Sequence, residues 1–538
     1  MKAKYIILSV IILGAFIRFI GISIGMPDFP IFDEPNVTER ALRMGTGDLN
    51  PHWFANPSLW VYLNFAVFIL YFIIGKVFGL FASSRDFALS FFKDPSAFYI
   101  LSRSVTAVFG TLAILPLYSL IKRCYDQKTA YLSILLFAVN PLLVQESHFA
   151  KVDIPMLFFL LVSMIWIMKT YEDSSLKNYV MSGILIGLAV GTKYSAVVLY
   201  APLFLAHIFS SEGFRFKKLW SPRLLLGIAV SFVVLFLTTP FMAVDTQKFV
   251  SDIIAIYKSD KFGWSYMYGI PEKLSILYYP KVILEGMTLP ALLFSIAGAG
   301  LLFLRRINLK ELILYSPAVL TLLILAKTNN MGERFALPLI PFLLVLASIA
   351  VLYVTGRFKK KLFELFIILI LVLPALLVSL KSDLSMTTDS TITIAKTWIL
   401  ANIPEGSRII REPITPELIP TEAQMRINLS KIRKENPKFG NKTEYILKQE
   451  NVKRYNLKYI DVFEKEKAYE LNSLLSFRPE YIILSSEVYK RFKNKDFYPI
   501  QNRFYAWLEK NGKLEISFES KFKYYPTILV YRIKKGSI

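Results

Sequence analysis

The chain has 538 residues, of which 54% are hydrophobic, and it carries a formal net charge of +23. Apolar runs of about 18 residues or more predict membrane-spanning helices, and a soluble protein of this length does not hold so many of them. The basic residues lie largely in short loops between these runs, which indicates membrane orientation and lipid headgroups rather than nucleic acid. The single cysteine, Cys124, excludes an intramolecular disulfide.

The apolar runs predict a polytopic α-helical membrane domain over residues 1–381. About eleven spans are expected, near 5–24, 99–121, 129–145, 153–171, 179–192, 195–210, 223–243, 284–304, 310–327, 334–355 and 361–381. The first run lacks a small-residue cleavage pattern and is interpreted as an uncleaved span. Residues 382–538 alternate charges, aromatics and short apolar stretches, which predicts a water-soluble α/β domain.

One further apolar segment, 58–82, decides the orientation of everything that follows it. If it does not cross, one side of the membrane receives roughly eighteen basic residues in short loops and the other roughly nine, and the richer side is cytoplasmic. Polar interruptions at Asn64 and Lys76 also favour a re-entrant or interfacial helix pair on the outer side. We therefore expect a multi-pass protein of the cell membrane with a cytoplasmic N-terminus and an extracytoplasmic C-terminal domain.

This topology places five polar segments on one outer face. They are Asp33-Glu34, the loop 145–153, Lys193-Tyr194, the loop 244–283 and the segment 327–334. A carboxylate beside hydrocarbon is costly, so such a residue is a functional-site hypothesis by default. For Asp33-Glu34 the alternative is a solvated turn.

The cationic positions also allow two interpretations each. Arg103 either extends its charged group to the membrane surface or binds a phosphate, whose oxygens can pair with two N–H groups of the guanidinium. Lys193 either binds an anion or caps the preceding helix. The loop that holds His148, Lys151 and Asp153 has more ionisable groups than a hairpin turn needs, although contact with lipid headgroups would also explain them.

Two further segments contribute candidate site residues, an aromatic side chain in one and an arginine in the other. Trp264 lies in a stretch of aromatics and glycines that suits stacking on sugar rings, or else an interfacial aromatic belt. Arg334 precedes Pro338 and Pro341, and the resulting kink either borders a cavity or is purely structural.

These groups together fit glycosyl transfer from a lipid-linked sugar phosphate. An acidic residue can orient or deprotonate an acceptor hydroxyl. Arginine and lysine can stabilise the departing phosphate as its negative charge develops. An apolar groove between spans would hold a polyprenyl chain.

The set of residues resembles the GT-C glycosyltransferases, and more narrowly their protein mannosyltransferase/aminoarabinose transferase-like branch (glycosyltransferase family 39-like, lipid carrier-dependent). The matching features are Asp33-Glu34 after the first span, Arg103, the loop from His148 to Asp153, Lys193-Tyr194-Ser195, and Arg334 with its two prolines. The resemblance covers most of residues 1–381. It implies an inverting enzyme that moves a sugar from a polyprenyl-phosphate donor to a hydroxyl or amine of a lipid, glycan or protein.

The resemblance also implies roles for single residues. Asp33, Glu34 and Asp153 would be the catalytic carboxylates, with Asp33 activating the acceptor. The donor phosphate would contact Arg103, Lys193 and Arg334. The cavity would be lined by His148, Lys151, Tyr194 and Trp264.

Three points stay open at this stage. A transporter or flippase of lipid-linked sugars is the alternative function, although no internal repeat is visible. A receptor or scaffold would leave the charged outer loops unexplained. No cofactor is expected, but Asp33, Glu34 and Asp153 could share a divalent ion, and an oxygen-only site would favour Mg or Mn.

Overall fold

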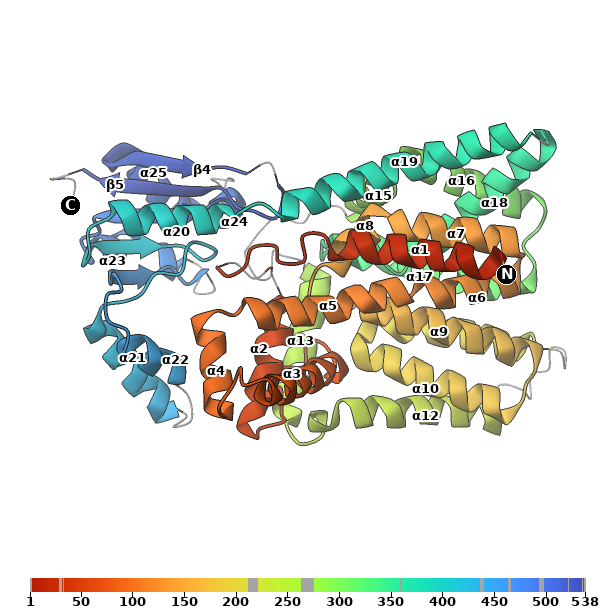
Figure 1. Cartoon of the computed structure of the whole chain (residues 1–538), viewed down its shortest axis with the longest axis horizontal. Coiled ribbons are helices and arrows are strands. Elements are labelled where there is room, and N and C mark those ends of the chain that lie inside the picture. Colours follow the sequence, from red (N-terminus) through yellow and green to blue (C-terminus); the bar gives the residue numbers. More distant parts are fainter. Residues whose placement is uncertain are drawn as a thin grey trace.

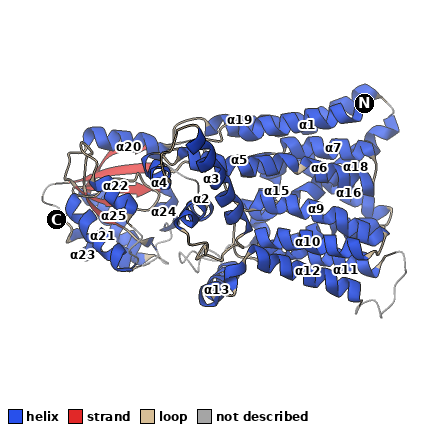
Figure 2. Ribbon diagram, turned by 60° about the horizontal axis from the view of Figure 1, so that its bottom comes forward, coloured by secondary structure: helices blue, strands red, loops and turns tan. Residues whose placement is uncertain are grey.

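A long helical bundle and a smaller domain that contains a β-sheet lie end to end in the computed structural model (Figures 1 and 2). The N-terminus lies at the end of the bundle that is opposite to the C-terminal domain (Figure 1). The structure describes residues 2–28, 31, 33–210, 221–262, 275–358, 360–435, 440–462, 466–492, 498–520, 522–534 and 536.

The bundle consists of apolar helices that run roughly side by side (Figure 1). They are α1 (Lys2–Phe19), α5 (Ser96–Leu112), α6 (Ile114–Cys124), α7 (Gln127–Val139), α8 (Pro141–Ser147), α9 (Asp153–Glu172), α10 (Leu176–Thr192), α11 (Tyr200–Ile208), α12 (Pro222–Thr238), α15 (Ser275–Met287), α16 (Leu289–Leu304), α17 (Leu309–Lys327), α18 (Ile340–Phe358) and α19 (Lys361–Met386). Short 3₁₀ turns include η2 (Tyr194–Leu199) and η5 (Glu333–Ala336). The expected polytopic helical membrane protein is confirmed.

The described part of the chain has six helices that are long and apolar enough to cross a membrane, or up to eight if each bent pair is one span. Three more apolar helices are shorter. The figure of eleven spans stays a prediction.

Two segments that were expected to be continuous spans are bent. Helices α7 and α8 meet at 55°, where Pro141 cannot continue the hydrogen-bond ladder and the Asn140 side chain caps the new helix by accepting from the Leu143 amide. Helices α15 and α16 meet at 110° around Thr288, whose φ of 72° reverses the chain. The first bend brings the loop 148–152 to the end of the bundle that faces the C-terminal domain.

Helices α10 and α12 approach closely because glycines line the surface between them. A Cβ on Gly183 would lie 2.2 Å from the carbonyl oxygen of Gly227, and one on Gly187 would lie 2.7 Å from that of Ser231. Small residues at this spacing allow membrane helices to pack backbone against backbone. The tight pair fixes the end of α10, where Lys193 follows Thr192.

The segment between α1 and α5 covers the end of the bundle. It contains α2 (Glu34–Arg43), η1 (Met44–Thr46), α3 (Leu59–Val77) and α4 (Ser84–Lys93). Helix α3 passes the length and composition criteria for a span, but it runs across the bundle helices (Figure 2). It exposes apolar side chains such as Leu70 and Val77, as an interfacial helix would. The expected helix pair within 58–82 is wrong, since these residues form one helix.

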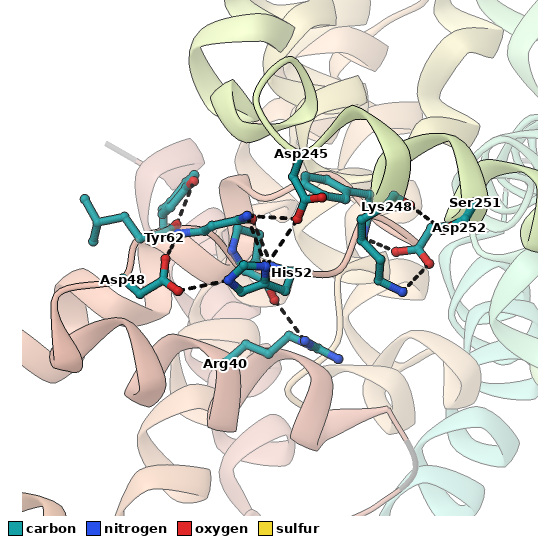
Figure 3. Close-up of polar contacts among 12 residues, drawn as sticks. Arg40, Asp48, His52, Tyr62, Asp245, Lys248, Ser251 and Asp252 are labelled. Atoms are coloured by element: carbon teal, nitrogen blue, oxygen red, sulfur yellow. Dashed lines mark hydrogen bonds and ion pairs between the residues drawn. The ribbon is translucent and has the colours of Figure 1, made fainter. Parts of the chain in front are cut away.

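A polar cluster around His52, here called the His52 clasp, connects this segment to α13 (Thr246–Phe262) and the residue before it (Figure 3). His52 lies between Asp48, with Nε2 2.9 Å from Oδ2, and Asp245, with Nδ1 3.2 Å from Oδ2. Asp252 accepts a hydrogen bond from the Phe54 amide at 2.8 Å. These contacts are partly exposed and join two segments that are far apart in sequence.

The C-terminal domain is built on a five-stranded mixed sheet of order β2-β1-β3-β5-β4. Strands β2, β1 and β3 are parallel, and β5 pairs antiparallel with β3 and β4. The strands are β1 (Arg408–Arg411), β2 (Asn456–Tyr459), β3 (Tyr481–Ser485), β4 (Gly512–Phe518) and β5 (Ile528–Ile533). The helices are α20 (Thr391–Asn402), α21 (Glu422–Glu435), α22 (Asn441–Leu447), α23 (Leu471–Leu475), α24 (Ser486–Tyr489) and α25 (Pro499–Asn511), with 3₁₀ turns η7 (Lys467–Tyr469) and η8 (Lys490–Phe492).

The two faces of the sheet follow the alternation of its strand residues. Ile409 and Ile483 pack with α20, whereas their neighbours Ile410 and Ile482 pack with α25. The α20 face shares its core with Phe149 of the bundle. The C-terminal domain therefore docks on the loop that carries the predicted site residues.

Candidate active site

Glu34 and Arg103 form a fully buried ion pair, here called the sealed pair, near the end of the bundle. The Arg103 Nε donates to Glu34 Oε1 at 2.8 Å and Nη2 donates to Oε2 at 2.7 Å, and both side chains are 0% exposed. Arg103 also donates to the carbonyl oxygens of Ile22 and Ile24. Glu34 accepts from the amides of Ile31 and Ala150.

This pair corrects two expectations. Neither Arg103 nor Glu34 has a surface that a substrate could reach, because each is enclosed and bonded on both of its polar edges. Arg103 is therefore not placed to bind a donor phosphate, and Glu34 is not placed to act on an acceptor. Together they join α2, α5 and the loop after α8.

Asp33, the neighbour of Glu34, points elsewhere. It precedes α2 in the left-handed conformation, with φ of 71°, so the chain turns between the two carboxylates. Asp33 is 45% exposed and forms an ion pair with Arg334. Burial raises the pKa of the Asp33 carboxyl, but the positive charges of Arg334, Lys151 and Lys193 outweigh it and hold that pKa below its usual value.

Asp153 and Lys193 complete what we call the Asp33 network, whose four members are Asp33, Asp153, Lys193 and Arg334. The Lys193 ammonium pairs with Asp153 at the start of α9, and Arg334 Nε lies 4.0 Å from Asp153 Oδ2. The ring of Phe335 lies beneath both cations, 4.8 Å from Lys193 Nζ and 5.3 Å from Arg334 Cζ. Four chain segments far apart in sequence thus meet at one end of the bundle.

Lys151 and Glu146 border this network from the loop after α8. Lys151 Nζ lies 3.7 Å from Glu146 Oε2 and 4.5 Å from the centre of the Phe149 ring. Lys151 also contributes to the potential at Asp33. Its expected place in the lining of the cavity stays a prediction.

The C-terminal domain supplies two side chains to the same place, here called the roof pair, Lys523 and Tyr524. The Tyr524 hydroxyl accepts a hydrogen bond from the Gln145 side-chain Nε2, and its ring meets Phe149 edge to face at 5.0 Å. Lys523 Nζ lies 2.6 Å from Glu333 Oε2, next to Arg334. The segment between β4 and β5 covers the polar end of the bundle.

Comparisons with known proteins agree with this architecture. Residues 96–241 match the family model described as dolichyl-phosphate-mannose-protein mannosyltransferase. The structure of ArnT from Cupriavidus metallidurans in the apo state superposes with a TM-score of 0.51 at 13% identity, over 98% of each chain. The chain has the GT-C fold. The predicted resemblance to the GT-C glycosyltransferases and their mannosyltransferase-like branch is confirmed.

Two further solved structures have TM-scores just below 0.5. The Archaeoglobus fulgidus oligosaccharyltransferase tethered with an acceptor peptide has a TM-score of 0.49 at 15% identity, over 99% of this chain and 75% of that one. ArnT from Cupriavidus metallidurans bound to undecaprenyl phosphate has a TM-score of 0.49 at 12% identity, over 97% of each chain. No curated protein matches the chain.

Two described residues that were expected to line the cavity, His148 and Tyr194, do not join the network. His148 is 0% exposed, and its ring nitrogens lie 2.9 Å and 2.7 Å from the carbonyl oxygens of Val144 and Ile20. It connects α8 to the chain after α1, which contradicts the expected cavity role. The Tyr194 hydroxyl is buried without a hydrogen-bond partner among the described residues. Trp264 lies outside the described residues.

Four residues that border the network have no distinctive pattern in the sequence. Gln145 and Glu146 lie in the predicted loop, but their residue types do not distinguish them from its other polar residues. Glu333 precedes Arg334 and shares its solvent-facing turn. Tyr524 belongs to another domain, and only the packing between domains brings it near.

The carboxylates considered for a shared Mg or Mn ion have separate partners. Glu34 pairs with Arg103, Asp33 with Arg334 and Asp153 with Lys193. In the described segments, no three His, Cys, Asp or Glu side chains are grouped so that they could hold a metal ion.

Proposed function

We propose that this protein is an inverting glycosyltransferase that moves a sugar from a polyprenyl-phosphate donor to a hydroxyl or amine of a lipid, glycan or protein acceptor. The observation that carries the proposal is the Asp33 network, in which an accessible carboxylate adjoins two cations at one end of an apolar bundle. The mannosyltransferase family match over residues 96–241 supports the same class of reaction.

The network supplies both halves of the reaction. The donor phosphate binds between Arg334 and Lys193, which releases part of their contact with Asp33 and Asp153. Asp33 then accepts the proton of the acceptor hydroxyl as its oxygen bonds to the anomeric carbon. The bond from that carbon to the phosphate oxygen breaks, and the phosphate leaves with the electron pair, stabilised by the two cations. Attack opposite to the leaving group inverts the anomeric centre.

The low pKa of Asp33 suits an electrostatic switch. While Arg334 is bound to Asp33, that carboxylate is a weak base. A phosphate that draws Arg334 away removes part of this stabilisation, so that Asp33 becomes more basic when the donor is in place.

The orientation of the protein belongs to the proposal. A cytoplasmic N-terminus and an extracytoplasmic C-terminal domain place the network at the outer face of the cell membrane, next to membrane lipids that can include the donor. The distribution of basic loops supports this arrangement. The cluster of charges at one end of the bundle also fits an enzyme better than a transporter, whose charged site is expected near the midplane.

Purified full-length protein with a radiolabelled polyprenyl-phosphate sugar tests the proposal. We expect release of the polyprenyl phosphate and transfer of label to a hydroxyl acceptor, with inverted anomeric configuration in the product. Intact donor after incubation with mannosyl, glucosyl and aminoarabinosyl carrier lipids would contradict it.

A further inference from the structure

Glu146 is a buried carboxylate that the reaction described above does not use. Its side chain lies at the end of α8 and is 3% exposed. Its Oε2 atom makes no hydrogen bond with any described residue, and the nearest cation, Lys151 Nζ, is 3.7 Å away. A buried hydrogen-bond acceptor without a donor is destabilising, and more so if it is charged, so this atom calls for a partner.

The Tyr524 hydroxyl provides a complementary group above the same loop. Gln145, the neighbour of Glu146, donates a hydrogen bond to the Tyr524 oxygen, which leaves the hydroxyl hydrogen free to be donated elsewhere. Burial and the negative charges of Glu146 and Glu333 raise the pKa of Tyr524 well above its usual value, so it stays protonated and remains a donor. A molecule placed here meets one acceptor and one donor.

The charges around Glu146 and Tyr524 indicate whether a bound ligand would be charged or neutral. The basic side chains Lys151, Lys193 and Arg334 are matched by the acidic side chains Glu146, Asp153 and Asp33, and Lys523 is matched by Glu333. A cationic ligand gains no net attraction from such a balanced set. A neutral group that both donates and accepts hydrogen bonds satisfies Glu146 and Tyr524 without disturbing the balance.

We propose that Glu146 and Tyr524 form an acceptor subsite that binds a hydroxyl group of a neutral, polyhydroxylated acceptor. This inference rests on the proposed glycosyltransferase function and adds the acceptor class to it. The Glu146 carboxylate accepts from the acceptor hydroxyl, and the Tyr524 hydroxyl donates to the same or a neighbouring oxygen. The C-terminal domain thereby acts in selecting the acceptor, since Tyr524 reaches the site only from that domain.

Octyl mannoside, as a neutral hydroxyl acceptor, tests the subsite with full-length protein and a radiolabelled polyprenyl-phosphate sugar. Glu146→Gln should raise the KM for octyl mannoside about 10-fold or more, as expected for losing a hydrogen bond to a charged group. Tyr524→Phe should raise it about 3- to 10-fold, as expected for a neutral hydrogen bond. In both variants we expect the dissociation constant for undecaprenyl phosphate to stay within about twofold, because neither residue touches the phosphate-binding cations.

Glu285→Gln is the matched control, since it also replaces a carboxylate by an amide but lies in an exposed ion pair with Lys281 on α15. Its KM for octyl mannoside should match that of the wild type. An aminodeoxy counterpart of octyl mannoside tests the charge argument and should be a poorer acceptor for the wild type.

The outcomes separate this inference from the function on which it rests. An unchanged KM for octyl mannoside in both Glu146→Gln and Tyr524→Phe would overturn the subsite and leave donor cleavage intact. A loss of undecaprenyl phosphate binding as large as the rise in KM would also overturn it, by showing a general structural role. Wild-type protein that neither cleaves donor nor transfers sugar would overturn the proposed function, and the subsite with it.

Discussion

Asp33 and Glu34 are adjacent in sequence, but they lie in opposite environments. Glu34 is 0% exposed and meets Arg103 through two hydrogen bonds, whereas Asp33 is 45% exposed and meets Arg334 at the edge of the network. The left-handed turn at Asp33 separates them, because it ends the irregular segment there and starts α2 with Glu34 facing the core. Accessibility, rather than residue type, distinguishes the catalytic candidate from the structural one.

Arg103 and Arg334, the partners of these two carboxylates, differ in the same way in how accessible they are. Arg103 is saturated by a carboxylate and two carbonyl oxygens, so a phosphate would have to break a buried pair to bind it. Arg334 is 30% exposed and shares its charge between Asp33 and Asp153. Exchanging one carboxylate for a phosphate costs much less at Arg334 than at Arg103.

The largest expected effect comes from breaking the sealed pair. Arg103→Met leaves the Glu34 carboxylate buried without its cation, which should cost about 3–5 kcal/mol of stability. Thermal unfolding of detergent-solubilised protein would show it as a large fall in the midpoint. The double variant Arg103→Met with Glu34→Leu should recover much of the loss, because both charges are then gone. A single variant as stable as the wild type would contradict the structural role of this pair.

Removing Arg334 should change both donor affinity and pH dependence. Arg334→Met should raise the donor KM about 10-fold or more, as expected for a charge-assisted hydrogen bond to phosphate. It should also raise the pKa of Asp33, since burial raises that pKa and Arg334 is the largest influence that lowers it.

The pH dependence of activity shows in which direction the pKa of Asp33 moves. Asp33 acts as a base only when ionised, so activity falls as the pH drops through its pKa. The acid limb of kcat/KM should therefore lie below the usual range for aspartate in the wild type and move to higher pH in Arg334→Met. Lys523→Met is the control, because Lys523 pairs with Glu333 and is not among the main charges that lower the pKa of Asp33. An acid limb that stays in place would exclude Asp33 as the titrating base.

The smallest expected effect concerns the His52 clasp. His52→Asn should cost less than about 1 kcal/mol, because exposed ion pairs contribute little and asparagine tolerates the left-handed backbone at this position. Hydrogen exchange should rise locally over residues 48–54 and 245–252. Exchange that rises instead around Asp33 would show that the clasp supports the active site.

The sequence was sufficient to predict that distant polar segments meet. Asp33, Asp153, Lys193 and Arg334 all flank apolar runs, and the count of basic residues placed them at the same end of the spans. The structure brings these four together. Apolar patterning and the positive-inside rule are signals of this kind, because they determine the side of the membrane on which a loop lies.

The sequence was not sufficient to predict which charges pair. Arg103 lies near the end of an apolar run, where an arginine that binds phosphate would also lie. Only the packed structure shows that its guanidinium is already bonded to the Glu34 carboxylate. His148 shares a loop with Asp153, but it lies beyond the bend after Asn140 and is buried against α1. Lys523 and Tyr524 reach the site through contacts between domains, which leave no periodic pattern in the sequence.

The most direct test compares Asp33→Asn with Glu34→Gln in the same assay, with turnover of a polyprenyl-phosphate sugar measured per folded molecule and the unfolding midpoint measured alongside it. We predict that Asp33→Asn lowers turnover about 10²- to 10⁴-fold, as expected for loss of a general base, with little change in stability. Glu34→Gln should instead lower the unfolding midpoint while its folded fraction keeps most of the turnover. An active Asp33→Asn variant, or a stable but inactive Glu34→Gln variant, would contradict this assignment of the two carboxylates.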